Sequence, residues 1–200
     1  MKVKPLISSA RDLVEICVRR RWLVTGLVVT AFVLCGVGMG AVNKQFFPKG
    51  YVAALKLDNG QVLTEASAIL QYLADLQPAA HLAPANGSWE RVRLQEWLNF
   101  IASEIHGGLA IFFNPAIQGD VRAMFVATLY KRFAVLVQTL ERQDYLLGER
   151  YSVADAYLFV VLRWAGFHDI DLQQWPALTA FQQRVGARAA VTAALAAESA

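Results

Sequence analysis

Two short stretches carry side chains that could bind or convert a ligand. Glu65 stands where a helix is predicted to begin, so its carboxylate could accept hydrogen bonds from an ammonium group. The free N–H groups of the first helical turn, beginning with that of Ala66, could bind a carboxylate. The same acid is also an ordinary first-turn residue that the helix dipole favours. His106, taken alone, is interpreted more readily as a solvated helix histidine than as a site residue.

The elements that would position Glu65 follow from the spacing of apolar residues. Residues 52–57 are predicted to form a strand, and residues 61–64 the return strand. Asp58-Asn59-Gly60 is predicted to be the hairpin turn between them, because Asn-Gly supplies the positive φ values that a tight turn needs. A helix is predicted over residues 65–77, because apolar side chains recur there at helical spacing and Pro78 ends the pattern. A linker follows at residues 84–87.

The remainder is predicted to be entirely helical, and His106 lies in its first helix. That helix runs from about 89 to 112, and Asn114-Pro115 ends it. Further helices are predicted over 120–142 and 153–167, and another begins at Pro176, a residue favoured in the first helical turn. The inward-facing positions of the first helix are apolar: Leu94, Trp97, Leu98, Ile101 and Ile105.

Ser152 and Asp155 have the spacing of an N-capping box. Ser152 can accept from the backbone N–H of Asp155, and the Asp155 carboxylate can reach back to the N–H of Ser152. The helix that follows is very apolar, which predicts that it is the central helix of its domain. We therefore assign both residues a structural role.

Charge and cysteine usage divide the chain near residue 50. Residues 1–50 carry eight Lys and Arg against two acids, a net charge of +6, which leaves −3 for residues 51–200. No basic stripe runs through the second part, so a nucleic-acid partner is not expected. Both cysteines, Cys17 and Cys35, lie in the first part, which excludes a disulfide framework or a cysteine metal site from the second. We expect no metal.

The N-terminal part contains an uncharged run from Trp22 to Val42, long enough to cross a bilayer as a helix. A buried core helix is the alternative, although a core helix of this length usually shows a polar stripe. Arg19-Arg20-Arg21 directly precedes the run. Positive charge stays on the cytoplasmic side, so a single span with a cytoplasmic N-terminus is predicted.

Three kinds of processing signal are alternatives to that span. Gly38-Met39-Gly40 is a weak candidate for the small-x-small cleavage site of a signal peptide. Cys35 is a candidate lipoprotein cysteine, but such a site requires a small residue before the cysteine, and Leu34 is not small. The arginine triplet loosely matches a twin-arginine signal. Residues 11–48, with VRRRWLV and VNKQFFP, resemble the first transmembrane helix of resistance-nodulation-division exporters.

Three motifs after Pro48 resemble the glutathione transferases. PKGYVAALKLDNGQVLTEASAILQYLAD resembles the family's second strand pair and third helix, and SVADAYLFVVLRWA its central capping-box helix. EWLNFIASEIHGG resembles the bacterial beta class in particular. The resemblance covers residues 48–200. It implies conjugation of glutathione to a small electrophile or binding of a hydrophobic ligand, no metal, and a homodimer built on the helix from Trp89 to Phe112.

The resemblance also implies site residues. The backbone of Val52 would pair with the cysteinyl part of glutathione, and Glu65 with the N–H of Ala66 would hold its γ-glutamyl end. The remaining residues would line the thiol side and the partner subunit's site: Asn99, Ser103, Glu104, Ile105 and His106. Of these, His106 is the candidate catalytic residue.

Two departures from the family pattern predict impaired catalysis. The family's first β-α-β unit carries the residue that meets the glutathione thiol, and residues 1–47 do not match it. The family places a cis-proline after the position of Val52, where this chain has Ala53. A cis bond before a non-proline costs about 2.5–4 kcal/mol, so the Val52–Ala53 bond is expected to be trans.

The predicted fold class is mainly α. A transmembrane-type segment over 1–47 precedes the remnant of a thioredoxin-like α/β domain over 48–78 and an all-α transferase C-terminal domain over 88–200. The predicted function is that of a glutathione transferase-like protein with impaired catalysis, located at the membrane. A non-catalytic membrane-tethered binding domain and a gene-fusion product without selected function are alternatives, and a cytoplasmic location, as in the parent family, is the alternative to the membrane.

Overall fold

The computed structural model describes residues 53–57 and 59–198. They fall into two compact units, one containing the described residues up to Ala80 together with those from Ala189 onward, the other running from His81 to Arg188. The predicted membrane span over 22–42 and the exporter-like segment over 11–48 lie outside the described residues. So do Val52 and the bond that joins it to Ala53.

The first unit begins with a β-hairpin. β1 (Ala54–Lys56) pairs antiparallel with β2 (Val62–Thr64), with Leu55 opposite Leu63. The loop lies where the turn is predicted, between Leu57 and Gln61, because Leu57 donates its N–H to the carbonyl oxygen of Gln61 at 2.8 Å. Gly60 has a φ of 83°, the left-handed conformation that closes a three-residue hairpin loop.

Helix α4 (Ala66–Asp75) follows the hairpin directly, and a short 3₁₀ turn, η1, spans Pro78–Ala80. One face of α4 buries Ile69, Leu70 and Ala74. The alanine-rich α10 (Ala189–Glu198) belongs to the same unit. The packing of α4 positions its N-terminal turn at the end of β2, one residue after the hairpin ends.

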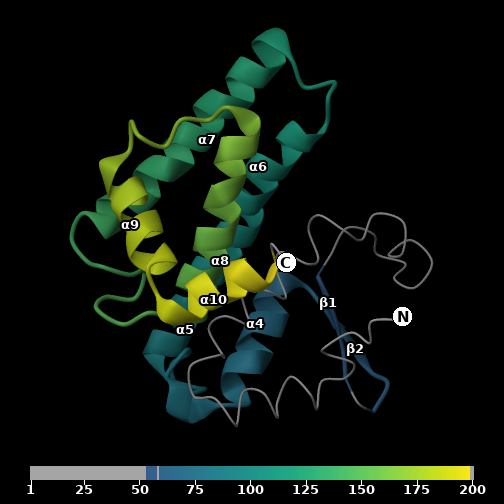
Figure 1. Ribbon diagram of the computed structural model, residues 1–200, viewed down its shortest axis with the longest axis vertical. Helices are drawn as coiled ribbons and strands as arrows, with labels where there is room; N and C mark the ends of the chain where they lie inside the picture. Colours follow the sequence, from purple (N-terminus) through teal and green to yellow (C-terminus); the bar gives the residue numbers. More distant parts are fainter. Residues whose placement is uncertain (1–52, 58, 199–200) are drawn as a thin grey trace. The chain divides into compact units, whose positions relative to one another are not determined.

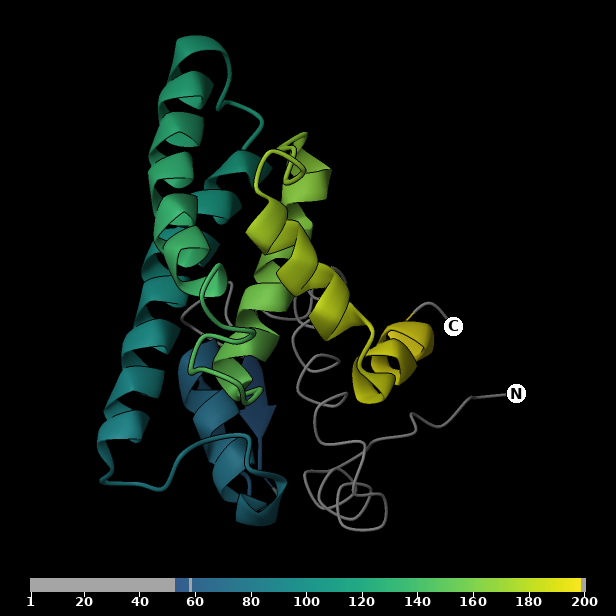
Figure 2. The same ribbon diagram turned by 90° about the vertical axis from the view of Figure 1, so that its left-hand side faces the viewer.

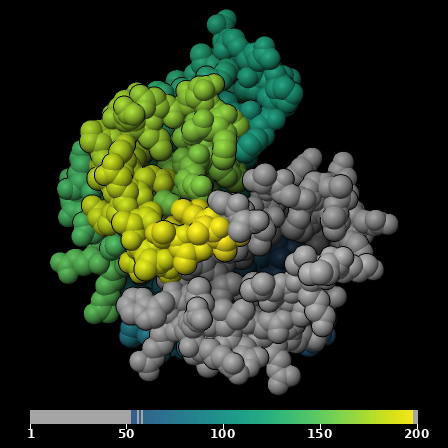
Figure 3. All heavy atoms as spheres, viewed as in Figure 1, coloured from purple at the N-terminus to yellow at the C-terminus, as the bar shows by residue number. Residues whose placement is uncertain are grey.

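The second unit, called the helical unit below, is a bundle around one buried helix. Its elements are α5 (Trp89–Phe100), η2 (Ile101–His106), α6 (Gly107–Ala110), η3 (Ile111–Phe113), α7 (Gly119–Leu140), α8 (Val153–Arg163), η4 (Trp164–His168) and α9 (Pro176–Gly186). Helix α8 contacts α5, η2 and α9 (Figure 1), and ten of its eleven residues are buried. Figure 2 shows α7, α8 and α9 from a second direction, and Figure 3 shows the outer side-chain surface in the view of Figure 1. The prediction of a central helix is confirmed.

The first helix of the bundle departs from the predicted regular α-helix. Its α-helical part ends at Phe100, six residues of π-helix follow as η2, and α-helix resumes over Gly107–Ala110. The five residues predicted to face inward along it are all buried. A π segment widens the turn by one residue and is frequent at functional sites.

Helix α7 is long and apolar enough to cross a membrane by length and composition alone, the one such helix among residues 53–57 and 59–198. Its buried side chains are Leu129, Phe133, Leu136 and Leu140. That spacing makes a single apolar stripe, which faces α9 and η2 in the bundle.

Helix α8 begins at the predicted capping box. Asp155 is fully buried, and its Oδ2 accepts hydrogen bonds from the N–H and from the hydroxyl of Ser152, both at 2.8 Å. Its Oδ1 accepts the N–H of Leu146, also at 2.8 Å. One carboxylate therefore fixes the start of α8 and the loop before it.

Burial raises the pKa of Asp155 to about 6, and the three hydrogen bonds offset part of this rise. Between about pH 4 and pH 6 the folded protein thus holds a proton that the unfolded chain has released. Stability therefore falls as pH rises through this window, by at most about 1.4 kcal/mol per pH unit.

The variant Asp155→Asn tests this account. The amide keeps the side chain's size but replaces an acceptor oxygen with a donor, so we expect a loss of about 2–4 kcal/mol near neutral pH. Urea unfolding measures the free energy of unfolding of both proteins. The difference between these two free energies should narrow as pH rises from about 4 to 7, because only the natural protein loses the Asp155 proton. A difference that widens with pH would contradict the assignment. Exposed Asp171→Asn on the loop before α9 is the matched control.

Candidate functional site

Glu65 occupies a strained backbone position between β2 and α4. Its φ and ψ are 71° and 119°, in a region that residues other than glycine rarely adopt. Such strain costs about 1–3 kcal/mol and is retained at ligand-binding positions more often than elsewhere. The strain turns the chain sharply enough for α4 to begin directly after the hairpin.

The N-terminal turn of α4 is free to bind a ligand as far as the described residues show. The exposed Glu65 side chain makes no capping hydrogen bond, although the Glu65 carbonyl oxygen accepts the N–H of Ile69 at 2.9 Å. The N–H groups at the start of a helix favour a carboxylate, and the Glu65 carboxylate favours an ammonium. The first unit thus presents both halves of an amino-acid recognition site at Glu65 and Ala66.

The predicted residues of the helical unit lie on or just before the π segment, and they have different surroundings. Asn99 is exposed, and its carbonyl oxygen accepts the Ser103 hydroxyl at 3.0 Å. Glu104 forms an ion pair with Arg132 of α7, with 2.6 Å between Oε2 and Nε. Ile105 is fully buried, so its side chain belongs to the core and only its backbone could reach a ligand.

His106 ends the π segment and is half-buried. Its Nδ1 lies 2.6 Å from the hydroxyl oxygen of Tyr157 on α8. Trp164 packs edge-on against the imidazole with ring centroids 4.8 Å apart. These contacts show that His106 is not a freely solvated side chain, the alternative that its sequence context favoured.

Aromatic side chains continue from Trp164 along η3 and η4. Phe113 contacts Trp164 and His168, at centroid distances of 5.3 Å and 4.3 Å. Phe113 and Phe167 are 56% and 69% exposed, an unusual degree for phenylalanine. We call the set Phe112, Phe113, Trp164, Phe167 and His168 the aromatic wall.

The aromatic wall is held by one cation. Arg122 of α7 lies over the ring of Phe112, with 5.4 Å from its guanidinium carbon to the ring centroid, and donates to the carbonyl oxygen of His168. Partial burial, followed by the charge of Arg122, lowers the pKa of His168 below its ordinary value. His168 is therefore neutral at physiological pH, and the wall offers an apolar surface.

Sequence reasoning missed the aromatic wall, Tyr157 and Trp164. Their positions are set by contacts between residues about fifty apart in the chain, which helical periodicity does not report. The available signal is the density of aromatic residues at 112–113 and 164–168, which follow His106 and Tyr157 respectively by about seven residues.

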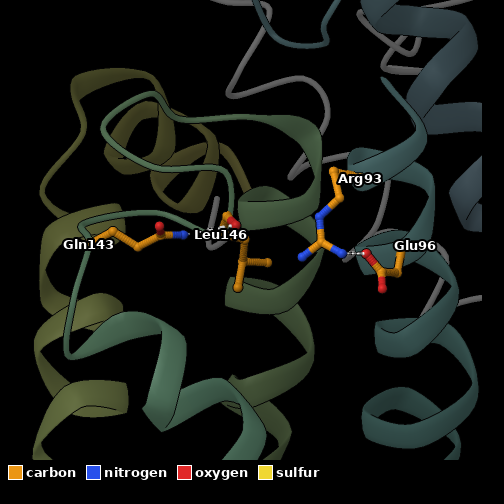
Figure 4. Close-up of polar contacts among 4 residues, drawn as sticks. All are labelled: Arg93, Glu96, Gln143 and Leu146. Carbon is orange, nitrogen blue, oxygen red and sulfur yellow. Dashed lines mark hydrogen bonds and ion pairs between the residues drawn. The ribbon is translucent and has the colours of Figure 1, made fainter. Parts of the chain in front are cut away.

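The helical unit also has a cavity of about 760 Å³ away from His106. Its lining includes three arginines: Arg93, Arg142 and Arg150. Figure 4 shows Arg93 paired with Glu96 on α5, and Gln143 donating to the carbonyl oxygen of Leu146 at 3.0 Å. Of the predicted residues only Ser152 borders this cavity, and Ser152 is engaged in the capping box.

No group of three or more His, Cys, Asp or Glu side chains could hold a metal ion within residues 53–57 and 59–198. The described candidate groups are thus an acid at a free helix terminus, a positioned imidazole and an apolar aromatic surface. The acid of the first unit suits the binding of an amino-acid-like ligand. The imidazole of the helical unit suits proton transfer or hydrogen bonding to a ligand.

Comparison with known proteins places these features in a family. Residues 100–189 match the family model described as glutathione S-transferase, C-terminal domain. Glutathione S-transferase GstA of Escherichia coli is 41% identical over 151 residues, which cover 76% of this chain and 75% of that protein. Glutathione S-transferase GST-4.5 of Xanthomonas campestris is 36% identical over 162 residues, or 76% and 77% of the two chains.

Solved structures agree with the sequence relatives. A ternary complex of BphK, a bacterial transferase, has a TM-score of 0.78 and 42% identity, covering 88% of this chain and 94% of that one. A sphingomonad transferase complexed with glutathione has a TM-score of 0.77 and 36% identity, with the same two coverages. The exporter resemblance of residues 11–48 stays a prediction. The chain that carries Glu65 and the positioned His106 belongs to the bacterial glutathione S-transferases.

Proposed function

We propose that this chain binds glutathione and conjugates it slowly to hydrophobic aromatic electrophiles. The observation that carries the proposal is the held imidazole of His106, which lies in the same unit as an exposed aromatic surface. Family membership supplies the chemistry, in which the sulfur of glutathione attacks the electrophile.

Glutathione would be recognised at its γ-glutamyl end by the first unit. That end carries an ammonium and a carboxylate on one carbon, and Glu65 with the Ala66 N–H offers one partner to each. The strained backbone at Glu65 supports this assignment, since strain of that kind is retained where a ligand or a fold demands it. Val52, Asn99, Ser103 and Glu104 remain proposed contacts of the same ligand.

His106 would act on the sulfur. The thiolate is the reactive form of a thiol, and a hydrogen-bond donor beside the sulfur favours it. We propose slow turnover because no residue of the sequence 1–47 can be assigned to the thiol-activating role of the family. His106 then supplies the main stabilisation of the thiolate.

The aromatic wall would receive the electrophile. Phe113 and Trp164 meet edge to face, and such rings accept another flat ring in offset or edge-on contact at about 0.5–1.5 kcal/mol per pair. This arrangement favours aryl electrophiles over short aliphatic ones.

Association into a homodimer is part of the proposal. Helix α5 exposes Trp89 and Val92, which are 70% and 48% accessible, and α7 exposes Val135, which is 40% accessible. The resemblance places the dimer contact on the helix that begins with Trp89, and symmetric dimers are the commonest assembly.

A second candidate is a non-catalytic domain tethered to the membrane. The uncharged run Trp22–Val42 after three arginines is the observation that favours it. The two candidates differ in turnover, because only the first requires conjugation.

The variant Glu65→Gln should bind glutathione about 10- to 100-fold more weakly than the natural protein, since it loses a charge-assisted hydrogen bond worth about 1.5–3 kcal/mol. Isothermal titration calorimetry measures this directly. Glu149→Gln removes an exposed acid from the loop before α8 and should leave the affinity unchanged. Equal affinity of Glu65→Gln and the natural protein would refute the assignment.

Conjugation of glutathione to an aryl halide should be slow in the natural protein and about 10²-fold slower in His106→Ala, which removes a group that stabilises the thiolate. The matched control is His81→Asn, at an exposed histidine whose φ of 53° an asparagine adopts readily. Unchanged turnover in His106→Ala would exclude a role for His106. Glutathione binding without any turnover would favour the tethered, non-catalytic candidate.

Val92→Glu should convert the dimer into a monomer, because it places a charge in the centre of the proposed contact. Sedimentation velocity of the natural protein and the variant in the same detergent or buffer gives the two masses. Ala180→Glu, at an exposed position on α9, should remain dimeric. A natural protein that sediments as a monomer would rule out the dimer.

A further inference from the structure

One polar contact of the His106 imidazole joins two distant parts of the chain. His106 Nδ1 and the Tyr157 hydroxyl oxygen are 2.6 Å apart although the residues are 51 positions apart in sequence. Their rings stand at 90° with centroids separated by 5.7 Å. Tyr157 is 2% exposed, so the hydroxyl makes this contact from inside the bundle.

We propose that Tyr157 is a positioning residue for His106. Its hydroxyl donates to Nδ1 and thereby keeps the neutral imidazole in the tautomer that carries its proton on Nε2. Nε2 is then the hydrogen-bond donor that His106 offers to the glutathione sulfur. The inference rests on the proposed function of His106 and adds a residue to it.

The direction of the hydrogen bond follows from distance and from acidity. Hydroxyl donors reach their acceptors at about 2.5–3.0 Å, whereas N–H donors prefer about 2.7–3.2 Å, so 2.6 Å fits a hydroxyl donor. A phenol is also the stronger acid of the pair, and an imidazole nitrogen is a stronger acceptor than a phenol oxygen. The proton therefore lies on Tyr157, and Nδ1 accepts.

The position of Tyr157 follows from the capping box. Asp155 fixes the start of α8 through three hydrogen bonds, and Tyr157 lies two residues further along the same buried helix. Its hydroxyl is thus attached to one of the most constrained segments of the bundle. His106 lies across from it on the π segment, where η2 packs against α8.

Trp164 restricts the imidazole from a second direction. Its ring stands at 85° to that of His106, and Phe113 supports Trp164 at 81°. Tyr157 thus sets which nitrogen carries the proton, while Trp164 limits rotation of the ring. The imidazole is thus held in one orientation before the ligand arrives, and such preorganisation strengthens electrostatic stabilisation of a charged sulfur.

The first test reads the tautomer without any ligand. Long-range ¹H–¹⁵N spectra of the full-length protein should show His106 as the Nε2–H tautomer, and Tyr157→Phe should convert it to a mixture of the two tautomers. Tyr130→Phe, which removes a hydroxyl that contacts Gln174 on the surface, should leave the His106 signals unchanged. A natural protein in which His106 carries its proton on Nδ1 overturns the proposal without any variant.

The second test measures the fraction of bound glutathione whose sulfur is ionised to the thiolate. At a fixed pH near 7, ultraviolet absorbance should show about tenfold less thiolate of bound glutathione in Tyr157→Phe than in the natural protein. The affinity of the variant for glutathione should stay within about threefold of that of the natural protein. Loss of affinity and thiolate in equal proportion would mean a merely structural role and would overturn the proposal. Absence of glutathione binding in the natural protein would instead refute the proposed function, while the tautomer measurement still decides the hydrogen bond.

Discussion

The buried Asp155 carboxylate is the interaction on which the helical unit depends. It accepts hydrogen bonds from the N–H and hydroxyl of Ser152 and from the N–H of Leu146. A buried charge is tolerated only when its oxygens are satisfied in this way. The network sets where α8 begins, and α8 is the helix around which α5, η2 and α9 pack. Because Tyr157 lies two residues beyond Asp155, the same network places the hydroxyl that contacts His106.

The π segment is the second constraint, and it acts from the opposite side of that contact. One additional residue in the helical turn changes which side chains face α8 after Phe100. Ile105 stays in the core while His106 meets Tyr157 and Trp164. The imidazole is therefore held between the buried helix α8 and the aromatic wall.

Features that arise from near neighbours in the chain could be predicted from the sequence. The capping box of Ser152 and Asp155, the opening of α9 at Pro176 and the buried positions of α5 follow from short-range spacing, and the structure has them. The hairpin was placed correctly between residues 54 and 64, and its loop lies between Leu57 and Gln61 as predicted. Glu65 stays a candidate site residue, and its strained φ could not be foreseen from its type.

Features that arise from tertiary contacts could not be predicted in this way. The π segment has no periodicity signal that distinguishes it from α-helix over six residues, and Tyr157 looked like one more apolar position of a buried helix. The family relationship of residues 48–200 was accessible, because three motifs carry it and the comparisons confirm it. The membrane span over residues 22–42 stays a prediction.

The central claim is that the imidazole of His106 acts on the sulfur of glutathione. Titration of isotope-labelled full-length protein tests it most directly, with the His106 ring followed by NMR and with S-methylglutathione, which lacks the free thiol, as the comparison ligand. The account predicts that glutathione shifts the His106 signals along one saturable curve and that S-methylglutathione shifts them less. His106 signals that do not respond to glutathione, or that respond equally to both ligands, would contradict it.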